Sequence, residues 1–458
     1  MGQFKLLILI CVRILNRQKG KIVLGAIAIL FLIFAQLKLG FIFFHPSLRE
    51  GFVGTYQEHN LPHEVTRLVS KSLVESDENG RIKPVLVTGW ETNNDATIFK
   101  FKLKEDLKWS DGQKIKSSDL EFDIPETVIS YPDEKTLQFK LKESYSPLPS
   151  LLTRPIFKKG TLMGTGPYSI SKVEKSRVFI TKIILESTLP DLPKIYIRFY
   201  PNEKVAVTGF NIGEVQVLFG INNPKLIDNN PQLNLRQKKD FSKIVTILYH
   251  TKDGLLSNRS VRQALSFQAP KIEGEENADN PFPPFWWVYD PEAKKYLSNP
   301  QEANMALGRA KSALPEEKLN QELILTSTPN LEEVANKIIA EWNKLGFDVK
   351  LRLESGVPQN FQSLLITQSL PQDPDQYFLW HSSQEKTNLT KYSSARVDKD
   401  LEDGRKVITE DDRKAKYFDF QKTLLEDAPA TFLYFPKYNV IYLKKVEKML
   451  NKVLPIQI

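Results

Sequence analysis

Residues 323–353 have the hydrophobic pattern of a strand, a helix and a second strand. The segment 323–327 is a short apolar strand, and residues 347–353 alternate between apolar and polar side chains. Asn330 and Glu333 are spaced as a capping box, and Gly346 ends the helix. One face of this helix carries Leu331, Val334, Ala335, Ile338, Ile339, Trp342 and Leu345. The order predicts a βαβ unit with two parallel neighbouring strands.

Strand and turn sequences dominate the first half of the chain. Ser118 and Glu121 resemble a capping box at the start of a short helix. A second capped helix is predicted from Thr409, with Asp412 in its cap, to about Glu426, and the strand TFLYF follows it. The other predicted strands are residues 98–103, 135–142 and 168–185, with turns at 109–112 (WSDG) and 164–167 (GTGP).

Residues 22–44 form a long apolar run that only Gln36 and Lys38 interrupt. At about 1.5 Å per residue, a helix of this length crosses a hydrocarbon layer of about 30 Å. The alternative, a cleaved signal peptide, is disfavoured because the run is too long and no small-x-small site follows it. Basic residues precede the run, so we expect residues 1–21 in the cytoplasm and the bulk of the chain outside the cell membrane.

Most of the excess positive charge of the chain lies before or within this apolar run. Among 458 residues the net charge is +8, but residues 1–45 hold six basic side chains and no acidic one. The other residues carry 57 basic and 55 acidic side chains, a net charge of +2, so a nucleic-acid partner is not predicted. The composition, with 41% hydrophobic and 26% charged residues, is that of a globular protein. The one cysteine, Cys11, leaves the body of the chain without disulfides.

Motifs for catalysis are weak in this sequence. There is no G-x-S-x-G and no P-loop, and the two S-x-x-K matches, at 169–172 and 383–386, are of a kind that arises by chance. His59 and His63 have the spacing of two metal ligands on a helix, but Pro62 argues against a regular helix there. We therefore predict neither an enzyme nor a cofactor or metal site.

Aromatic residues on loops say more about function than these catalytic motifs do. Trp286 and Trp287 follow a proline-rich loop, NPFPPF, and Tyr377 and Trp380 follow the segment DPD at 373–375. Aromatics on loops of an α/β scaffold commonly line ligand clefts, although core packing explains them equally well.

Several segments, taken in order, resemble the extracytoplasmic solute-binding proteins of peptide, dipeptide and nickel ABC importers (family 5). The similarity rests on the order of motifs along most of the exported chain. The segments are IKPVLVTGWETNNDATIFKFKLKEDLKWSDGQKIKSSDLEF, GTGPYSI, SNRSVRQALSF, DPEAKKYL, LGFDVKL, DPDQYF and LLEDAPATFLYF.

This resemblance implies a two-lobed α/β periplasmic-binding-protein-like fold with a central hinge, here preceded by one transmembrane helix. Ligand then binds between lobes that close on it, and no covalent chemistry is involved. The implied divisions are 1–21 cytoplasmic, 22–44 membrane anchor, 46–245 lobe 1, 246–435 lobe 2 and 436–458 a return to lobe 1.

The chain departs from the family pattern in ways that affect ligand choice. The transmembrane anchor replaces the lipid that most tethered members use, and the family insert before GTGPY is shortened to about 40 residues. Peptide-binding relatives carry an acid three residues before the position of Asp373, where this chain has Leu370. A ligand ammonium facing Leu370 would lack its counter-charge. A common Tyr-Glu pair reads Ser70-Lys71, which reverses a charge near the expected cleft.

We therefore predict a membrane-anchored receptor that binds peptide or a similar small solute and delivers it to the permease and ATPase of an ABC importer. The alternatives are a non-transporting surface receptor or scaffold with the same fold, and a metal receptor that uses His59 and His63. The predicted ligand-binding residues are Tyr56, Trp286, Trp287, Gln368, Asp373 and Tyr377.

Overall fold

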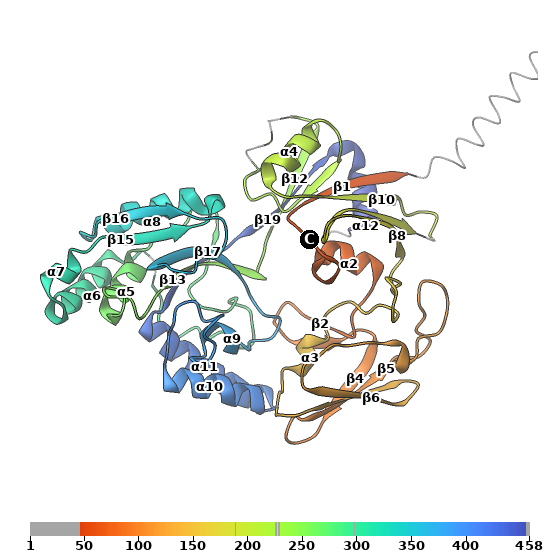
Figure 1. Ribbon diagram of the computed structural model, residues 1–458, viewed down its shortest axis with the longest axis horizontal. Coiled ribbons are helices and arrows are strands. Elements are labelled where there is room, and N and C mark those ends of the chain that lie inside the picture. Colours follow the sequence, from red (N-terminus) through yellow and green to blue (C-terminus); the bar gives the residue numbers. More distant parts are fainter. Residues whose placement is uncertain (1–45, 188, 225–226, 228–229, 297, 455–458) are drawn as a thin grey trace, which may run out of the picture.

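A mixed seven-stranded sheet forms the first lobe of the computed structural model, which describes residues 46–187, 189–224, 227, 230–296 and 298–454 (Figure 1). The strand order is β12-β19-β11-β1-β10-β9-β8, and β1 is parallel to both neighbours. The strands are β1 (Ser47–Val53), β8 (Tyr168–Ser176), β9 (Phe179–Ser187), β10 (Lys194–Tyr200), β11 (Val217–Phe219), β12 (Leu233–Lys239) and β19 (Lys437–Leu443).

Short helices cover this first sheet. The longest is α4 (Glu203–Asn211), whose N-cap Asn202 accepts a hydrogen bond from the amide of Val205 at 3.1 Å. The others are α2 (His63–Val69) and α12 (Glu447–Val453), with the 3₁₀ turns η1 (Glu58–Asn60) and η5 (Lys444–Val446). Leu48 and Phe52 of β1 pack with Val65 of α2 in the core of this lobe.

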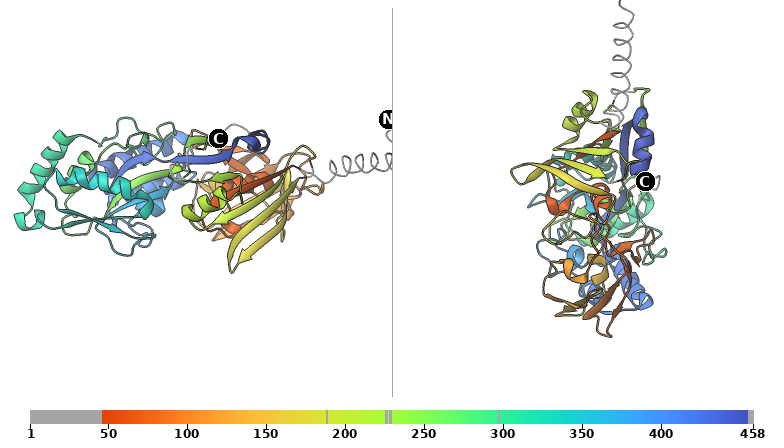
Figure 2. Two further views of the ribbon diagram at one scale, coloured as in Figure 1. Left: turned by 90° about the horizontal axis from the view of Figure 1, so that it is seen from above. Right: turned by 90° about the vertical axis from the view of Figure 1, so that its right-hand side faces the viewer.

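A small β domain lies below the first lobe (Figures 1 and 2). Its main sheet has the order β4-β5-β7-β6 and a core in which Phe99, Phe101 and Phe139 are fully buried. Residues 98–103 (IFKFKL) alternate between buried aromatics and exposed lysines, which explains this strand. Its elements are β2 (Val74–Ser76), β3 (Ile82–Pro84), β4 (Val87–Thr92), β5 (Ile98–Leu103), η2 (Ser117–Asp119), β6 (Thr127–Asp133), β7 (Thr136–Leu141) and α3 (Leu148–Leu151).

The second lobe lies at the opposite end of the molecule when the chain is viewed from above (Figure 2). Its six-stranded sheet has the order β14-β18-β13-β17-β15-β16. The strands are β13 (Lys243–Tyr249), β14 (Glu276–Asn277), β15 (Leu323–Ser327), β16 (Val349–Leu353), β17 (Ser363–Ser369) and β18 (Ala430–Phe435). The helices are α5 (Arg259–Gln268), α6 (Pro300–Ala313), α7 (Glu316–Leu319), η4 (Pro329–Leu331), α8 (Glu332–Asn343), α9 (Tyr377–Trp380), α10 (Ala395–Lys406) and α11 (Glu410–Asp427).

The predicted βαβ unit is confirmed, because β15 and β16 pair in parallel and α8 connects them. The predicted helix start at Thr409 is also confirmed, since its hydroxyl accepts a hydrogen bond from the amide of Asp412 at 3.2 Å. The cap at Asn330 is wrong: Pro329 starts a 3₁₀ turn, and no side chain caps α8. The helix expected after Ser118 is a single 3₁₀ turn.

Two short segments carry the chain between the lobes. The chain leaves β12 for β13 through residues 240–242 and returns from β18 to β19 through Pro436. The two segments lie side by side, because the amide of Asp240 donates to the carbonyl of Pro436 at 2.7 Å. Such a pair of adjacent crossings has the form of a hinge.

The small domain also contacts the second lobe directly. The amide of Trp287 donates to the carbonyl of Asn79, and its indole N–H donates to the carbonyl of Gly80, each at 3.1 Å. Gly80 has φ +72°, and a Cβ there would lie 2.8 Å from the ring of Trp286. A side chain at position 80 would therefore force the ring of Trp286 to move.

Among the described residues, none of the helices has both the length and the apolar character needed to cross a membrane. The predicted anchor, residues 22–44, lies outside the described residues.

Candidate ligand-binding cleft

A cleft of about 2660 Å³ lies between the two lobes and the small domain. The helix α2 and the strand β2 reach it from one side, and β17 and the loop after it reach it from the other (Figure 1). Small-molecule sites usually occupy about 300–1000 Å³. The cleft therefore has room for a ligand with the length of a short peptide.

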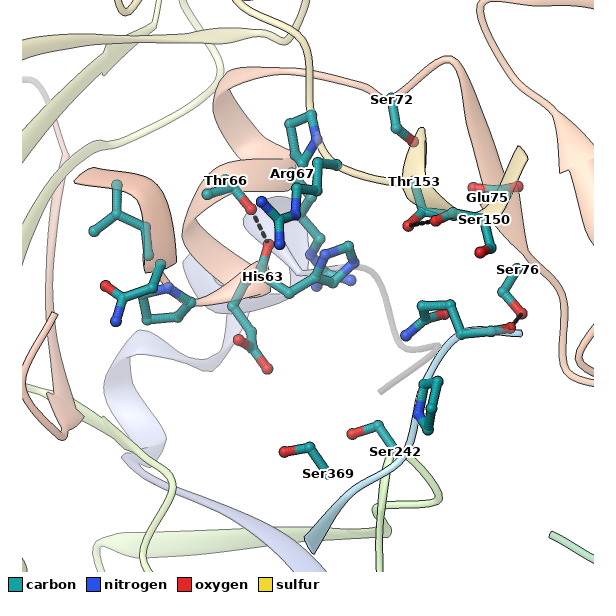
Figure 3. A pocket seen from close by; sticks show the side chains of 18 of the residues that line it. His63, Thr66, Arg67, Ser72, Glu75, Ser76, Ser150, Thr153, Ser242 and Ser369 are labelled. Atoms are coloured by element: carbon teal, nitrogen blue, oxygen red, sulfur yellow. Dashed lines mark hydrogen bonds between the residues drawn. The ribbon is translucent and has the colours of Figure 1, made fainter. Parts of the chain in front are cut away.

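The helix α2 presents a polar face to this cleft. His63, Thr66, Arg67 and Ser70 line the cleft at helical spacing, and Figure 3 shows the first three side by side. The opposite face, which carries Val65, Leu68 and Val69, is buried in the core of the first lobe. Packing of the apolar face therefore fixes the direction of the polar side chains.

The facing wall is polar as well, and it comes from the second lobe and from the crossing segment just before β13. Ser242, Thr367 and Ser369 line the cleft, together with the buried side chain of Leu370. In Figure 3 the hydroxyls of Ser242 and Ser369 lie across the open space from His63 and Arg67. A ligand between the lobes can thus meet polar groups on both sides.

Two acids on this wall are neutralised within the protein. Asp373 accepts two hydrogen bonds from Arg413, at 3.0 and 2.5 Å, and both side chains are buried. Burial acts to lower the pKa of the Arg413 guanidinium, but Asp373 outweighs it, and the pKa is raised. Asp375 likewise accepts from Arg405 at 2.9 Å and from the hydroxyl of Tyr145 at 3.2 Å.

A buried carboxyl of β1 lies next to α2. Glu50 of β1 is 2% exposed, and its Oε1 has no hydrogen-bond partner. Burial raises its pKa to about 8, with a further increase from Glu64 and a decrease from Arg67. At pH 7 this side chain is therefore mainly neutral.

The comparison with known families decides the class of this protein. Residues 81–388 match the model of bacterial extracellular solute-binding proteins, family 5, middle part. This chain belongs to family 5 of the bacterial extracellular solute-binding proteins. The match confirms the family that the motif order predicts.

Similar proteins bind peptides and metal complexes. The oligopeptide-binding protein AppA of Bacillus subtilis (strain 168) is 23% identical, with 86% of each chain covered. The structure of NikZ from Campylobacter jejuni, in complex with Ni(L-His), has a TM-score of 0.71 at 20% identity, covering 87% of this chain and 94% of that one. The ABC transporter substrate-binding protein CtaP from Listeria monocytogenes has a TM-score of 0.71 at 17% identity, with the same coverage. The two-lobed α/β fold of these binding proteins is therefore also the fold of this chain.

Three of the six predicted ligand-binding residues line the cleft of this family 5 protein: Tyr56, Trp286 and Asp373. The ring of Tyr56 packs on Phe199 at 5.0 Å, and its hydroxyl donates to the carbonyl of Val53 at 2.9 Å. The carboxylate of Asp373 is engaged by Arg413. Contact of these side chains with a ligand stays a prediction.

The other three predicted residues are absent from the lining of the cleft. Gln368 lies between Thr367 and Ser369, which line the cleft, so the alternation of a strand turns it to the other face of β17. Tyr377 stacks on His381, with ring centroids 4.0 Å apart, and carries the guanidinium of Arg405 at 3.9 Å from its ring. Trp287 faces a smaller cavity of about 260 Å³ next to the small domain.

The two histidines considered as metal ligands both line the cleft. Pro62 does not interrupt a helix there; it precedes α2, which begins at His63, while His59 lies in η1. Within the described ranges, no group of three or more His, Cys, Asp or Glu side chains is placed to hold a metal ion.

Thr66 and Arg67, on the polar face of α2, line the cleft but were not part of the motif analysis. The segment HEVTRLVS does carry a signal for it, because its apolar residues recur at 65, 68 and 69 and its polar ones at 63, 66, 67 and 70. The segment is too short for this pattern to stand out without the structure.

The turn GTGP holds α2 in place, and this gives a first prediction. A Cβ on Gly164 would lie 2.1 Å from the carbonyl oxygen of Val69, at the end of α2. We expect Gly164→Ala to lower the free energy of unfolding by about 3 kcal/mol, because the backbone must move. Urea unfolding checks this against Gly89→Ala, where a Cβ would meet nothing within 4 Å. Equal stability of the two variants would contradict the prediction.

Proposed function

We propose that this chain is a membrane-anchored extracytoplasmic receptor of an ABC importer, which binds a peptide or similar small solute in the interlobe cleft and delivers it to a permease. The observation that carries the proposal is the cleft itself, about 2660 Å³ in volume and lined by polar groups from both lobes. Two adjacent crossings between the lobes supply a hinge on which closure can occur. The oligopeptide-binding relative and the NikZ complex with Ni(L-His) support the binding of a small solute.

The test is a thermal-shift screen of the full-length chain, purified in a mild detergent. The panel contains mixed tripeptides, free amino acids, sugars and nickel. A ligand that binds only the folded state stabilises it by about 2.7 kcal/mol at a hundredfold excess over Kd. We expect a rise in Tm with the peptides. No rise with any member of the panel, in a sample that unfolds cooperatively, would contradict the proposal.

Membrane anchoring is tested separately by cell fractionation. The full chain should sediment with membranes, and deletion of residues 22–44 should release it, because this run is long enough to cross the bilayer. Protease added to intact cells should digest the chain after residue 46 and leave a cytoplasmic marker intact. Release of the undeleted chain by high salt alone would contradict a spanning anchor.

A second candidate is a non-transporting surface receptor or scaffold. The pairing of Asp373 with Arg413 and of Asp375 with Arg405 favours it, since neither acid is then free to hold a ligand ammonium. Uptake of labelled tripeptides in cells without this protein distinguishes the two: lost uptake supports the importer, and unchanged uptake supports the scaffold. A nickel-dependent rise in Tm that the double change His59→Ala and His63→Ala abolishes would instead indicate a metal receptor.

A further inference from the structure

The first sheet has one end at which the chain enters β1, and we call it the entry end. The strands β1 and β10 both start there, since Ser47 pairs with Lys194. The antiparallel strand β19 finishes there at Leu443, whose amide donates to the carbonyl of Gln216, just before β11, at 3.0 Å. The turn η5 and the helix α12, which follow β19, therefore start at the entry end.

The helix α12 stays close to the entry end along its length. At its far end the ammonium of Lys452 donates to the carbonyl of Asp191, in the loop before β10, at 3.3 Å. Its inner face, with Leu450 and Val453, packs with Leu48 of β1 in the core of the first lobe. Figure 2 shows α12, in dark blue, near the start of β1. Its outer face is therefore turned to solvent at this end of the molecule.

That outer face is basic. Four exposed lysines follow one another along η5 and α12, and those on α12 recur at helical spacing: Lys444, Lys445, Lys448 and Lys452. None of these four side chains forms an ion pair with a residue in the described ranges. The acid among them, Glu447, accepts a hydrogen bond from the hydroxyl of Tyr442 at 2.7 Å and lies 3.6 Å from the guanidinium of Arg236. The positive charge of the lysines is therefore not cancelled by Glu447.

Two exposed apolar side chains lie at the same end. Leu189, in the loop between β9 and β10, is 51% exposed, and Ile212 is 75% exposed. Ile212 follows α4, which leads from the far end of β10 back to the start of β11, so it lies at the entry end. Lysines combined with exposed apolar side chains are typical of surfaces that lie on a membrane.

The predicted anchor places a bilayer beside this end. The apolar run ends at Phe44, and β1 starts at Ser47. Three residue steps span at most about 11 Å. Exposed charges act over a distance of about 8 Å at physiological salt, so the lysines come within reach of charged headgroups. An acidic protein partner would have to be recruited to this face, whereas the chain itself holds the bilayer there.

We propose that the lysines of η5 and α12 bind anionic lipid headgroups of the membrane in which the chain is anchored, while Leu189 and Ile212 enter the interface. This inference rests on the anchor of the proposed function and adds a second, electrostatic contact with the same membrane. Phe52 and Val53, at the other end of β1, line the cleft. Contact at the entry end therefore turns the cleft away from the bilayer, towards the solute outside.

The experiment places the full-length chain in nanodiscs of phosphatidylcholine alone and in nanodiscs in which one lipid in three is phosphatidylglycerol. Mass spectrometry follows the acetylation of each lysine with time. We expect Lys444, Lys445 and Lys448 to react about threefold or more slowly in the anionic nanodiscs, because lipid phosphates hold their ammonium groups. High salt should remove this difference. The exposed Lys100 and Lys311, on the small domain and the second lobe, should react alike in both.

A second measurement follows the apolar contact. Ile212→Cys, combined with Cys11→Ser, gives a chain with a single cysteine for an environment-sensitive dye. Its emission should shift to the blue in the anionic nanodiscs. Replacing the three reactive lysines of η5 and α12 with glutamine should abolish the shift. The matched control, Lys100→Gln with Lys140→Gln and Lys311→Gln, removes the same charge from other exposed sites and should keep it.

The outcomes separate this contact from the anchor. Equal reactivity of the lysines in the two nanodiscs, with the chain retained in the discs, would overturn the lipid contact and leave the anchored receptor standing. A chain that does not stay in the discs would overturn the anchor and the contact with it. Equally slow reaction in both lipids would overturn the recognition of negative charge. Protection found only in membranes from the producing cells would assign this face to a protein partner and overturn the proposal.

Discussion

Replacing Asp373 with alanine should lower the free energy of unfolding by about 3–5 kcal/mol. The change leaves the guanidinium of Arg413 buried without its carboxylate, and both side chains are nearly inaccessible to solvent. Arg413→Ala should cost a similar amount, since it leaves Asp373 unpaired. Urea unfolding of the full-length chain without ligand measures both changes.

A double-mutant cycle shows whether the pair, and not the separate residues, carries this stability. The cycle consists of Asp373→Leu, Arg413→Met and the two changes together. Each single change leaves one buried charge unpaired, whereas the double change replaces the ion pair with apolar side chains and should recover most of the loss. Asp95→Ala removes an exposed carboxylate and should change the stability by less than about 0.5 kcal/mol. A strictly additive cycle would contradict the coupling. A stable Asp373→Ala chain that loses only ligand binding would show that Asp373 serves the ligand.

The stability of this pair bears on how the cleft recognises a solute. Asp373 is one of the predicted ligand-binding residues, and the acid expected from the resemblance is missing three residues before it, at Leu370. In the structure Asp373 is already satisfied by Arg413, and Asp375 by Arg405. Recognition through a ligand ammonium on this wall would require one of these ion pairs to open.

The parts of the fold that could be predicted are those with strong local patterns. The β15–α8–β16 unit follows from alternation, a helical apolar face and a terminating glycine, all within about 30 residues. The start of α11 follows from Thr409 and Asp412, three residues apart. The cap expected at Asn330 was wrong because Pro329 nucleates a 3₁₀ turn one residue earlier.

The residues of the cleft were harder to predict. Whether a residue lines the cleft depends on which side of its strand it occupies and on partners that are distant in the sequence. A shift of one residue along a strand moves a side chain to the opposite face, which is why Thr367 and Ser369 line the cleft and Gln368 does not. The partner of Asp373 lies 40 residues further along the chain, on α11, so no local spacing reveals it. Glu50 is a different case, because the alternation of β1 places it between the buried Leu48 and Phe52 on the core face.

Glu50 makes the stability of the protein depend on pH in a direction that can be worked out. Its pKa is about 8 in the folded protein, raised from 4.5, so between these values the folded state holds a proton that the unfolded state has lost. The contribution is fully present below about pH 4.5 and is lost as the pH rises towards 8. The loss amounts to about 1.4 kcal/mol for each pH unit in this window.

Glu50→Gln should therefore be more stable than the wild type at pH 8, by about 4 kcal/mol, and similar to it near pH 4.5. Glutamine has nearly the same shape and carries no charge, so the variant lacks this titration. Urea midpoints measured from pH 5 to pH 8 check the difference, with the exposed Glu91→Gln as the control. Parallel pH profiles for the wild type and Glu50→Gln would contradict the raised pKa. Arg67 lowers the pKa of Glu50, so Arg67→Gln tests whether the two side chains interact. With Glu50 present, the loss of stability should extend to higher pH, and with Gln at position 50 the pH dependence should stay unchanged.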